Sequence, residues 1–440
     1  MTSLQHTPPP PVTDTSEAAS RATAWGLTSV LMLLYLINYG DKVLLGIVAQ
    51  PLKDELGLSA SQIGLAGSVF FFAMTAGGFL AGPLSKRAPL KWVLAALAIG
   101  WALCLLPMIV AASFAMLVAS RLVLGLFEGP SSALIHTATY SWHPVEKRAL
   151  PGALITSAAA LSKIILAPLL TYLVVAHGWR SAFVAMCAAS LLWGAIWLTT
   201  WRPGPYGAPS RPRAGVGPDG SRPSSMSWRT LRTPTFLGGL AAAFSFYTLV
   251  SVILTWLPSY FEVGLGYSRL KAGSMFAIPS LVALVALFAT SYLGDRMMTK
   301  GISSRIHRGI IPGAGLLICG LCMVCLPWIG AAGLVVAVVS VGYGLGTVVF
   351  PLLNAAVSEI CPKEQLAGTL GVFLALMSSG GIVGPYLAGW IVDHTTSAAA
   401  GYALTFQVLG AVAALGAIAA LLTVNPPRDA RRVLAGRTGA

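Results

Sequence analysis

Long apolar blocks, separated by short polar breaks, run through the whole chain of 440 residues. Hydrophobic residues make up 56% of the sequence and charged residues only 10%, whereas soluble proteins carry about a quarter charged residues. Each block has about 20 residues, which is the length that an α-helix needs to cross a bilayer. Because lipid offers the backbone no hydrogen-bond partners, segments of this kind span as helices. The sequence therefore predicts an all-α membrane protein.

Twelve transmembrane helices are predicted, over residues 23–50, 60–84, 90–111, 114–140, 150–175, 180–201, 234–260, 270–293, 308–329, 332–357, 367–391 and 399–424. Lys and Arg are unevenly distributed between them. Of the 28 basic residues, 21 lie on the side of both termini and 4 on the opposite side. Such an excess marks the cytoplasmic side, so both termini are expected in the cytoplasm, in a bacterial inner membrane. The same bias explains the net charge of +14 without nucleic acid as a partner.

A polar linker divides the chain into two halves. Residues 202–233 are rich in Pro, Gly, Ser and Arg, a composition typical of linkers. They separate residues 23–201 from residues 234–424, each predicted to form a six-helix bundle. Residues 425–440 are expected to be a cytoplasmic tail. Residues 1–22 have neither the basic nor the apolar region of a signal peptide, and they are expected to form a disordered cytoplasmic tail.

The two halves resemble each other in sequence. "GLSASQIG" begins at Gly57 before the second predicted helix, and "GYSRLKAG" begins at Gly266 before the eighth. Lys86 and Asp295 align at the same offset of 209 residues. An offset that holds at separate places predicts a parallel repeat of two bundles. This arrangement is found in membrane proteins built from two repeated bundles, whose binding site lies between the halves near the middle of the membrane.

Five motifs are spread along the chain: "INYGDK", "RLVLGLFEGP", "HGWRSAF", "TWLPSYF" and "GTLGVFLALMSSGGIVGPYLAG". They resemble motifs of major facilitator superfamily transporters. More narrowly, the chain is similar to the anion:cation symporter family, whose members carry sugar acids, phthalate, sialic acid or glutamate. The resemblance implies a proton-coupled symporter that imports a small organic anion by alternating access.

The chain also departs from these families. The superfamily loop Gly-x-Leu-x-Asp-Arg-x-Gly has Lys86 at the Asp position and Pro89 at the second Gly position. Sugar-acid members tend to have Arg where this chain has Lys42, and Asn in the eleventh span where it has Leu374 and Ser378. We therefore expect a substrate with one carboxylate and a less polar body than a sugar acid.

Ionisable residues inside predicted spans concentrate in the first half. They are Asp41, Lys42, Arg121, Glu128 and Lys163. Charges at the bilayer centre cost about 2.5–3.5 kcal/mol each even on the lenient insertion scale, and they mark functional sites. With both acids ionised the five groups sum to +1, so a cavity lined by them attracts an anion, and more strongly after a proton is added. A proton and an anionic substrate then favour each other's binding.

These residues are assigned roles. Asp41 and Glu128 are predicted proton sites, as the resemblance also implies, and Lys42, Arg121 and Lys163 are predicted to face the substrate anion. The alternative is that they form structural ion pairs between helices. Arg121 and Glu128 share a helix face because they are seven residues apart. Polar and aromatic candidates for substrate contact, each of which is also a plausible packing residue, are Tyr39, Tyr247, Tyr343, Asn354 and Ser378.

Other classes of function lack a signal. Cys319, Cys322 and Cys325 have the spacing of a metal cluster but lie in an apolar span, where packing is expected. No Walker motif and no hydrolytic set of residues occurs, so no enzyme activity, cofactor or metal ion is expected, and a monomer is expected. Two alternatives to a proton symporter stay open: an exporter of drugs or natural products by proton antiport, and a non-transporting sensor. Sodium also stays open as the coupling ion.

Overall fold

The computed structural model describes residues 14–144, 147–206, 228–299, 301–362 and 365–438. Within them, twelve helical segments are long and apolar enough to cross a membrane, which confirms the predicted number. Most of the predicted tail 1–22 and of the predicted linker 202–233 lies outside the described residues. The first helix begins at Asp14, earlier than the predicted start of the first span at residue 23.

Helices of the first half account for six spans. They are α1 (Asp14–Leu56), α2 (Ala60–Gly78), α3 (Ala81–Arg87), α4 (Leu90–Val110), α5 (Phe114–Glu128), α6 (Ser131–Tyr140), α7 (Ala149–Leu161), the π-helix η2 (Ser162–Leu166), α8 (Ala167–His177) and α9 (Trp179–Thr200). The short α10 (Trp228–Leu231) follows in the predicted linker.

Helices of the second half account for the other six spans. They are α11 (Pro234–Ser259), η3 (Tyr260–Gly264), α12 (Arg269–Met275), α13 (Ala277–Thr299), η4 (Ile306–Ile310), α14 (Ile311–Cys325), η5 (Leu326–Trp328), α15 (Ala332–Gly346), α16 (Val349–Ile360), α17 (Leu366–Ser378), α18 (Gly380–Asp393), α19 (Ala398–Thr423) and α20 (Pro426–Thr438).

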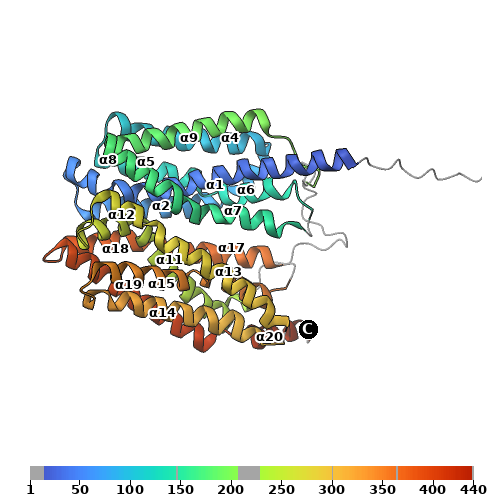
Figure 1. Cartoon of the computed structure of the whole chain (residues 1–440). Coiled ribbons are helices and arrows are strands. Elements are labelled where there is room, and N and C mark those ends of the chain that lie inside the picture. The colour runs from blue at the N-terminus through green and yellow to red at the C-terminus, as the bar shows by residue number, and fades with distance from the viewer. Residues whose placement is uncertain (1–13, 145–146, 207–227, 300, 363–364, 439–440) are drawn as a thin grey trace, which may run out of the picture.

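The two halves form two groups of helices that lie side by side. Figure 1 shows the first half, coloured blue to green, above the second half, coloured yellow to red. Helices α1, α2, α7 and α8 of the first half contact α11, α18, α13 and α12 of the second half, respectively. A binding site formed by both halves therefore has to lie at this interface.

Matched turns show the repeat between the halves. Gly57 and Gly266 both have a positive φ, of 64° and 73°, a conformation that glycine adopts without a steric penalty. Two residues later, Ser59 and Ser268 are the N-cap residues of α2 and α12, and each accepts a hydrogen bond from the backbone three residues on. The offset of 209 residues seen in the sequence thus corresponds to the same turn and helix start in each half.

Several spans are interrupted near their middle, which the sequence analysis did not predict. The fourth span changes helix at Gly129 and Pro130, so Glu128 is the last residue of α5. The fifth span contains the π-helix η2. The eleventh span changes from α17 to α18 at Ser379. Interrupted helices are common where transporters bind their substrates.

The halves pack tightly at the end of the molecule that lies away from both termini, on the left of Figure 1, which we call the distal end. A Cβ atom added to Gly64 of α2 would lie 2.3 Å from the carbonyl oxygen of Pro385 in α18, and one added to Gly389 would lie 2.2 Å from that of Ala60. Asp393 at the end of α18 accepts hydrogen bonds from the backbone of Ala60 and Ser61, at 2.9 and 2.7 Å. The structure is therefore closed at the distal end.

Candidate functional site

A buried ion pair joins α1 to α5. The Lys42 ammonium group donates to a carboxylate oxygen of Glu128. It also donates to the side-chain oxygen of Asn38, one helical turn earlier in α1, and lies 4.8 Å from the centre of the Tyr39 ring. The side chain of Glu128 is fully buried and that of Lys42 is 8% exposed. A buried pair of this kind is held by mutual attraction that has to offset the loss of hydration of both charges.

Asp41 and Arg121 lie beside this pair. Asp41 is fully buried and Arg121 is 2% exposed. The Arg121 Nη1 atom donates to the backbone carbonyl of Asp41 at 3.0 Å. Both carboxylate oxygens of Asp41 are buried and accept no hydrogen bond from the described residues. No described hydrogen bond therefore favours either the charged or the neutral form of this carboxyl group, and such a group is suited to exchange a proton.

Glycine residues explain why α5 can bring Arg121 and Glu128 so deep into the first half. A Cβ atom added to Gly125 would lie 2.4 Å from the carbonyl oxygen of Phe70 in α2. Gly77 of α2 has an equally close approach to the backbone of Leu126. Gly125, which lies between Arg121 and Glu128 in α5, therefore admits a neighbouring helix.

Lys163 forms a contact between the two halves. Its ammonium group is buried and donates to the Tyr343 hydroxyl of α15 at 2.9 Å. It also lies 5.0 Å from the centre of the Tyr343 ring. Lys163 is 7% exposed, so it points into the protein. Its partner in the second half is one of the aromatic candidates from the sequence.

Tyrosine residues lie beside both predicted lysine contacts. The Tyr39 ring lies 5.1 Å from that of Tyr35 and 4.8 Å from the Lys42 ammonium group. The Tyr247 ring contacts Phe71 of α2, with ring centres 6.1 Å apart. Tyr247 and Tyr343 thus contact residues of the first half across the interface, whereas Tyr39 lies beside Lys42 within the first half.

Asn354 and Ser378 are placed less centrally. The side-chain oxygen of Asn354 in α16 is buried and accepts no hydrogen bond from the described residues. The Ser378 hydroxyl of α17 lies 3.4 Å from that of Thr75 in α2, so it contacts the opposite half. No described hydrogen bond or ion pair joins either residue to the charged cluster. Their predicted contact with substrate stays a prediction.

One residue of the cluster was missing from the sequence-based prediction. Asn38 is 2% exposed; besides accepting from Lys42, its amide donates to the Ser131 hydroxyl at 3.3 Å. The spacing of four residues between Asn38 and Lys42 puts both on one face of α1. That spacing within "INYGDK" is the signal that could have identified it.

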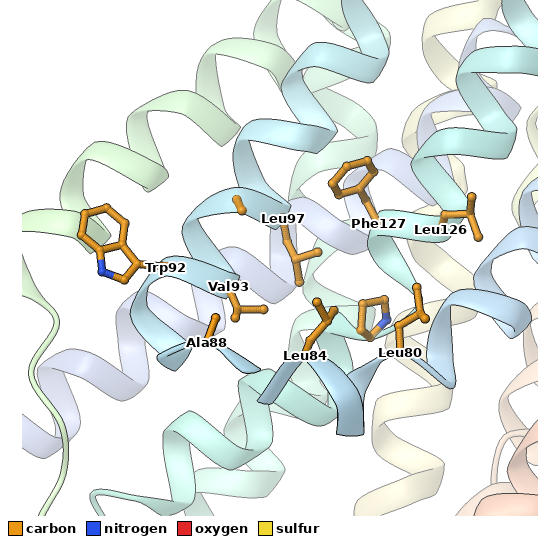
Figure 2. A pocket seen from close by; sticks show the side chains of 10 residues that line it. Leu80, Leu84, Ala88, Trp92, Val93, Leu97, Leu126 and Phe127 are labelled. Atoms are coloured by element: carbon orange, nitrogen blue, oxygen red, sulfur yellow. The ribbon is translucent and has the colours of Figure 1, made fainter. Parts of the chain in front are cut away.

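A separate cavity of about 460 Å³ opens on the first half between α3, α4 and α5. Figure 2 shows its lining, which includes Leu80, Leu84, Trp92 and Phe127. All of its lining residues are apolar. Because an anion needs charged or hydrogen-bonding partners, this cavity is not a candidate for the anion site.

Comparisons with known proteins agree with the fold described above. A family model described as "Major Facilitator Superfamily" matches residues 31–349 and 301–439. The chain is 29% identical to a probable sulfoacetate transporter, SauU, from Cupriavidus necator, over 92% of this chain and 95% of that protein. It is 27% identical to a hexuronate transporter from Bacillus subtilis, over 90% and 94% of the two chains. A bacterial homologue of the human lysosomal transporter Spinster, solved in an inward-facing and unoccupied conformation, has the same fold with a TM-score of 0.75, 18% identity and coverage of 92% and 98%.

Proposed function

The chain belongs to the Major Facilitator Superfamily, a family of transporters and not of enzymes, and from this premise we propose that it is a secondary active transporter for a small organic anion. Uptake is coupled to a proton and proceeds by alternating access. The protein crosses the membrane with twelve helices. The named relatives are a probable sulfoacetate transporter and a hexuronate transporter. Sulfoacetate and hexuronate are both organic anions, and this supports the same substrate class here.

The observation that carries this proposal is the buried set of two acids and two bases on α1 and α5. In the structure, the Lys42 ammonium group is paired with the Glu128 carboxylate. A proton bound to Glu128 removes the negative charge that holds Lys42, and the ammonium group then pairs with a carboxylate of the substrate. Binding of the proton and of the anion are thus linked, and the linkage is reciprocal.

Asp41 supplies a second proton position next to Arg121. Arg121 contacts the backbone carbonyl of Asp41, and the Asp41 carboxylate accepts no hydrogen bond from the described residues. Arg121 already donates to the backbone of Asp41, and its Nη2 atom has no partner among the described residues. That Nη2 atom is available to an anion. In the second half, Tyr247, Asn354 and Ser378 are proposed to contact the body of the substrate.

Orientation and environment follow from the distribution of basic residues. With 21 of 28 Lys and Arg on the side of the termini, both termini lie in the cytoplasm of a bacterial cell. The distal end then faces outward. The structure would accordingly be the state that is closed to the outside, in a protein that works as a monomer in the inner membrane.

Purified protein in liposomes tests the coupling. Asp41→Asn and Glu128→Gln are expected to abolish accumulation driven by a proton gradient, because neither amide binds a proton. Exchange of labelled for unlabelled substrate without a gradient is expected to continue. The substrate panel contains galactonate, glucuronate, galactarate and sulfoacetate, each measured at pH 5.5 and 7.5.

Asp54→Asn is the matched control, since it makes the same substitution in α1 at a carboxylate that is 58% exposed. It is expected to leave accumulation unchanged. Gradient-driven accumulation equal to that of the unmodified protein in both site variants contradicts the proton roles. External alkalinisation when substrate is added to the vesicles supports symport, whereas acidification supports the antiport alternative.

A further inference from the structure

Lys163 differs from Lys42 in its partners. Lys42 is paired with Glu128, and Arg121 donates to the backbone carbonyl of Asp41 in the same helix as Lys42. The Lys163 ammonium group is more than nine-tenths buried, and no carboxylate among the described residues lies within ion-pair distance of it. Its hydrogen-bond partner is the neutral hydroxyl of Tyr343. A buried cation without an anion is costly unless another charge compensates it.

The local backbone brings Lys163 to the site. Lys163 is the second residue of the five-residue π-helix η2, and such single-turn π segments inside α-helices occur frequently at functional sites. Leu166, the last residue of η2, packs against α1: a Cβ atom added to Gly40 would lie 2.9 Å from a methyl group of Leu166. Gly40 stands between Tyr39 and Asp41. The π-helix therefore lies against the segment of α1 that carries the charged cluster.

The sum of charges over the five groups shows that Lys163 has no negative charge to compensate it. With Asp41 and Glu128 ionised, they balance Lys42 and Arg121, and Lys163 is the excess positive charge. When one of the two acids binds a proton, the excess becomes two. One proton and one dianion therefore bring the five groups to neutrality, whereas a proton and a monoanion leave one buried positive charge uncompensated.

Donor chemistry at Lys163 suits an acidic group. The ammonium group has three N–H donors and spends one on the oxygen of Tyr343, whose own hydroxyl hydrogen stays free to donate. Two N–H groups of Lys163 in the first half and the O–H group of Tyr343 in the second half are thus not used by any described hydrogen bond. Lys42 likewise lies over a tyrosine ring, that of Tyr39.

We propose that Lys163 and Tyr343 bind a second acidic group of the substrate, and that the transported anion is therefore a dianion whose first acidic group pairs with Lys42 and Arg121. This inference rests on the proposed function and narrows its substrate class to short dicarboxylates and sulfonate carboxylates. It departs from the expectation of a single carboxylate that the exchange of Arg for Lys42 suggests. A dianion held in this way also joins the first half to the second.

Matched pairs of probes test the inference. Succinate, glutarate, adipate and sulfoacetate are each compared with the corresponding methyl ester, which removes one negative charge and adds only a methyl group. Binding to the purified protein is measured by calorimetry, and uptake is measured in liposomes. At least one diacid is expected to bind about tenfold or more tightly than its ester, because hydrogen bonds between charged groups are the strong ones.

Lys163→Gln is expected to abolish the advantage of the diacid and to change the affinity for the ester by less than about threefold. Tyr343→Phe removes the O–H donor and is expected to reduce the advantage in part. Lys271→Gln is the matched control, because Lys271 also lies over a tyrosine ring, 4.6 Å from the centre of that of Tyr267, but is exposed and outside the site. It is expected to leave the ratio unchanged.

The outcomes separate this inference from the proposed function. Equal loss of diacid and ester affinity in Lys163→Gln shows a merely structural contact and overturns the inference. So does an unmodified protein that binds monoanions as well as dianions. Failure of the unmodified protein to transport any organic anion from either panel contradicts the proposed function itself. Gel filtration and thermal unfolding of each variant establish that it is folded before it is compared.

Discussion

At the scale of single residues, the central feature is an ion pair between side chains that are 86 residues apart in the chain. Lys42 and Glu128 are each surrounded by protein, so neither can regain water when the other is removed. Asn38 accepts a hydrogen bond from Lys42 and donates to Ser131, which fixes the position of the ammonium group. The pair is therefore suited to hold Lys42 in place until a proton or an anion replaces one of its members.

A double-mutant cycle tests how strongly the pair is coupled. Lys42→Met is expected to lower the free energy of unfolding by about 3–5 kcal/mol, because it leaves the Glu128 carboxylate buried without its partner. Lys42→Met combined with Glu128→Gln is expected to recover at least about 1 kcal/mol of that loss. Thermal unfolding in detergent measures both variants. Additive effects of the two substitutions show that the side chains do not interact.

The five charged residues inside spans of the first half were identifiable from the sequence as candidates for the site, because charges inside apolar blocks are rare and costly. Their pairing was not identifiable. Nothing in the order of residues distinguishes an attraction of Lys42 for Glu128 from one for Asp41, its neighbour in the chain. That choice depends on the direction of each side chain and on the packing of α1 against α5. The π-helix that carries Lys163 was not predicted for a related reason. One wider turn does not change the apolar composition of a span, so the sequence does not reveal it.

At the scale of elements, the start of α2 is capped from the other half of the protein. Ser59 and Gln62 satisfy each other's backbone in a capping box. Asp393 of α18 accepts from the next two backbone N–H groups, of Ala60 and Ser61. A carboxylate at a helix N-terminus also interacts favourably with the helix dipole. The hydrogen bonds that complete α2 therefore exist only while the distal end is closed.

Removal of this cap is expected to favour opening at the distal end. Asp393→Ala removes the carboxylate that accepts from the two backbone N–H groups. A lost cap costs about 1 kcal/mol, which shifts the balance of states about fivefold. The probe is the variant Thr171→Cys, made in a protein from which the other cysteines have been removed. Thr171 is buried against Gly273 of the other half. The rate of reaction of this cysteine with a maleimide added outside liposomes is expected to rise.

Ser268→Ala is the matched control for that experiment. Ser268 caps α12 at the equivalent position of the repeat, but its hydrogen bond stays within the second half. Loss of a cap there weakens a helix without removing a contact between the halves, so the labelling rate is expected to stay unchanged. An equal rise in both variants means that opening reflects general loosening and not the Asp393 contact.

At the scale of the whole molecule, closure of the distal end depends on backbones that approach without side chains between them. Gly64 and Gly389 bring α2 and α18 together. Gly46 of α1 likewise meets the carbonyl oxygen of Leu254 in α11, where an added Cβ atom would lie 2.3 Å away. Alternating access requires this surface to form and to separate in each cycle, so its fit controls the balance of states.

Gly64→Ala is expected to act as a wedge in this surface. Its Cβ atom would lie 2.3 Å from the Pro385 oxygen, and overpacking of this kind costs about 1–3 kcal/mol in the closed state alone. Transport is expected to fall about tenfold, with labelling at the Thr171 probe increased. Gly26→Ala is the control, since nothing lies within 4 Å of an added Cβ atom there. Unchanged transport by Gly64→Ala contradicts the proposal that this closed surface is part of the cycle.

The sequence by itself determined the twelve spans, the six-plus-six repeat and the concentration of charged residues in the middle of spans of the first half. These features depend on composition and spacing, because the bilayer penalises polar groups at every position along a span. The tertiary structure decided which charges pair, that Lys163 meets Tyr343, and that the distal end is closed by Asp393 and by glycine contacts between α2 and α18. Those contacts join residues far apart in the chain, and their formation depends on how two separately folded bundles fit each other. The contact between Lys163 of one bundle and Tyr343 of the other, where we propose that the substrate binds, is of the same kind.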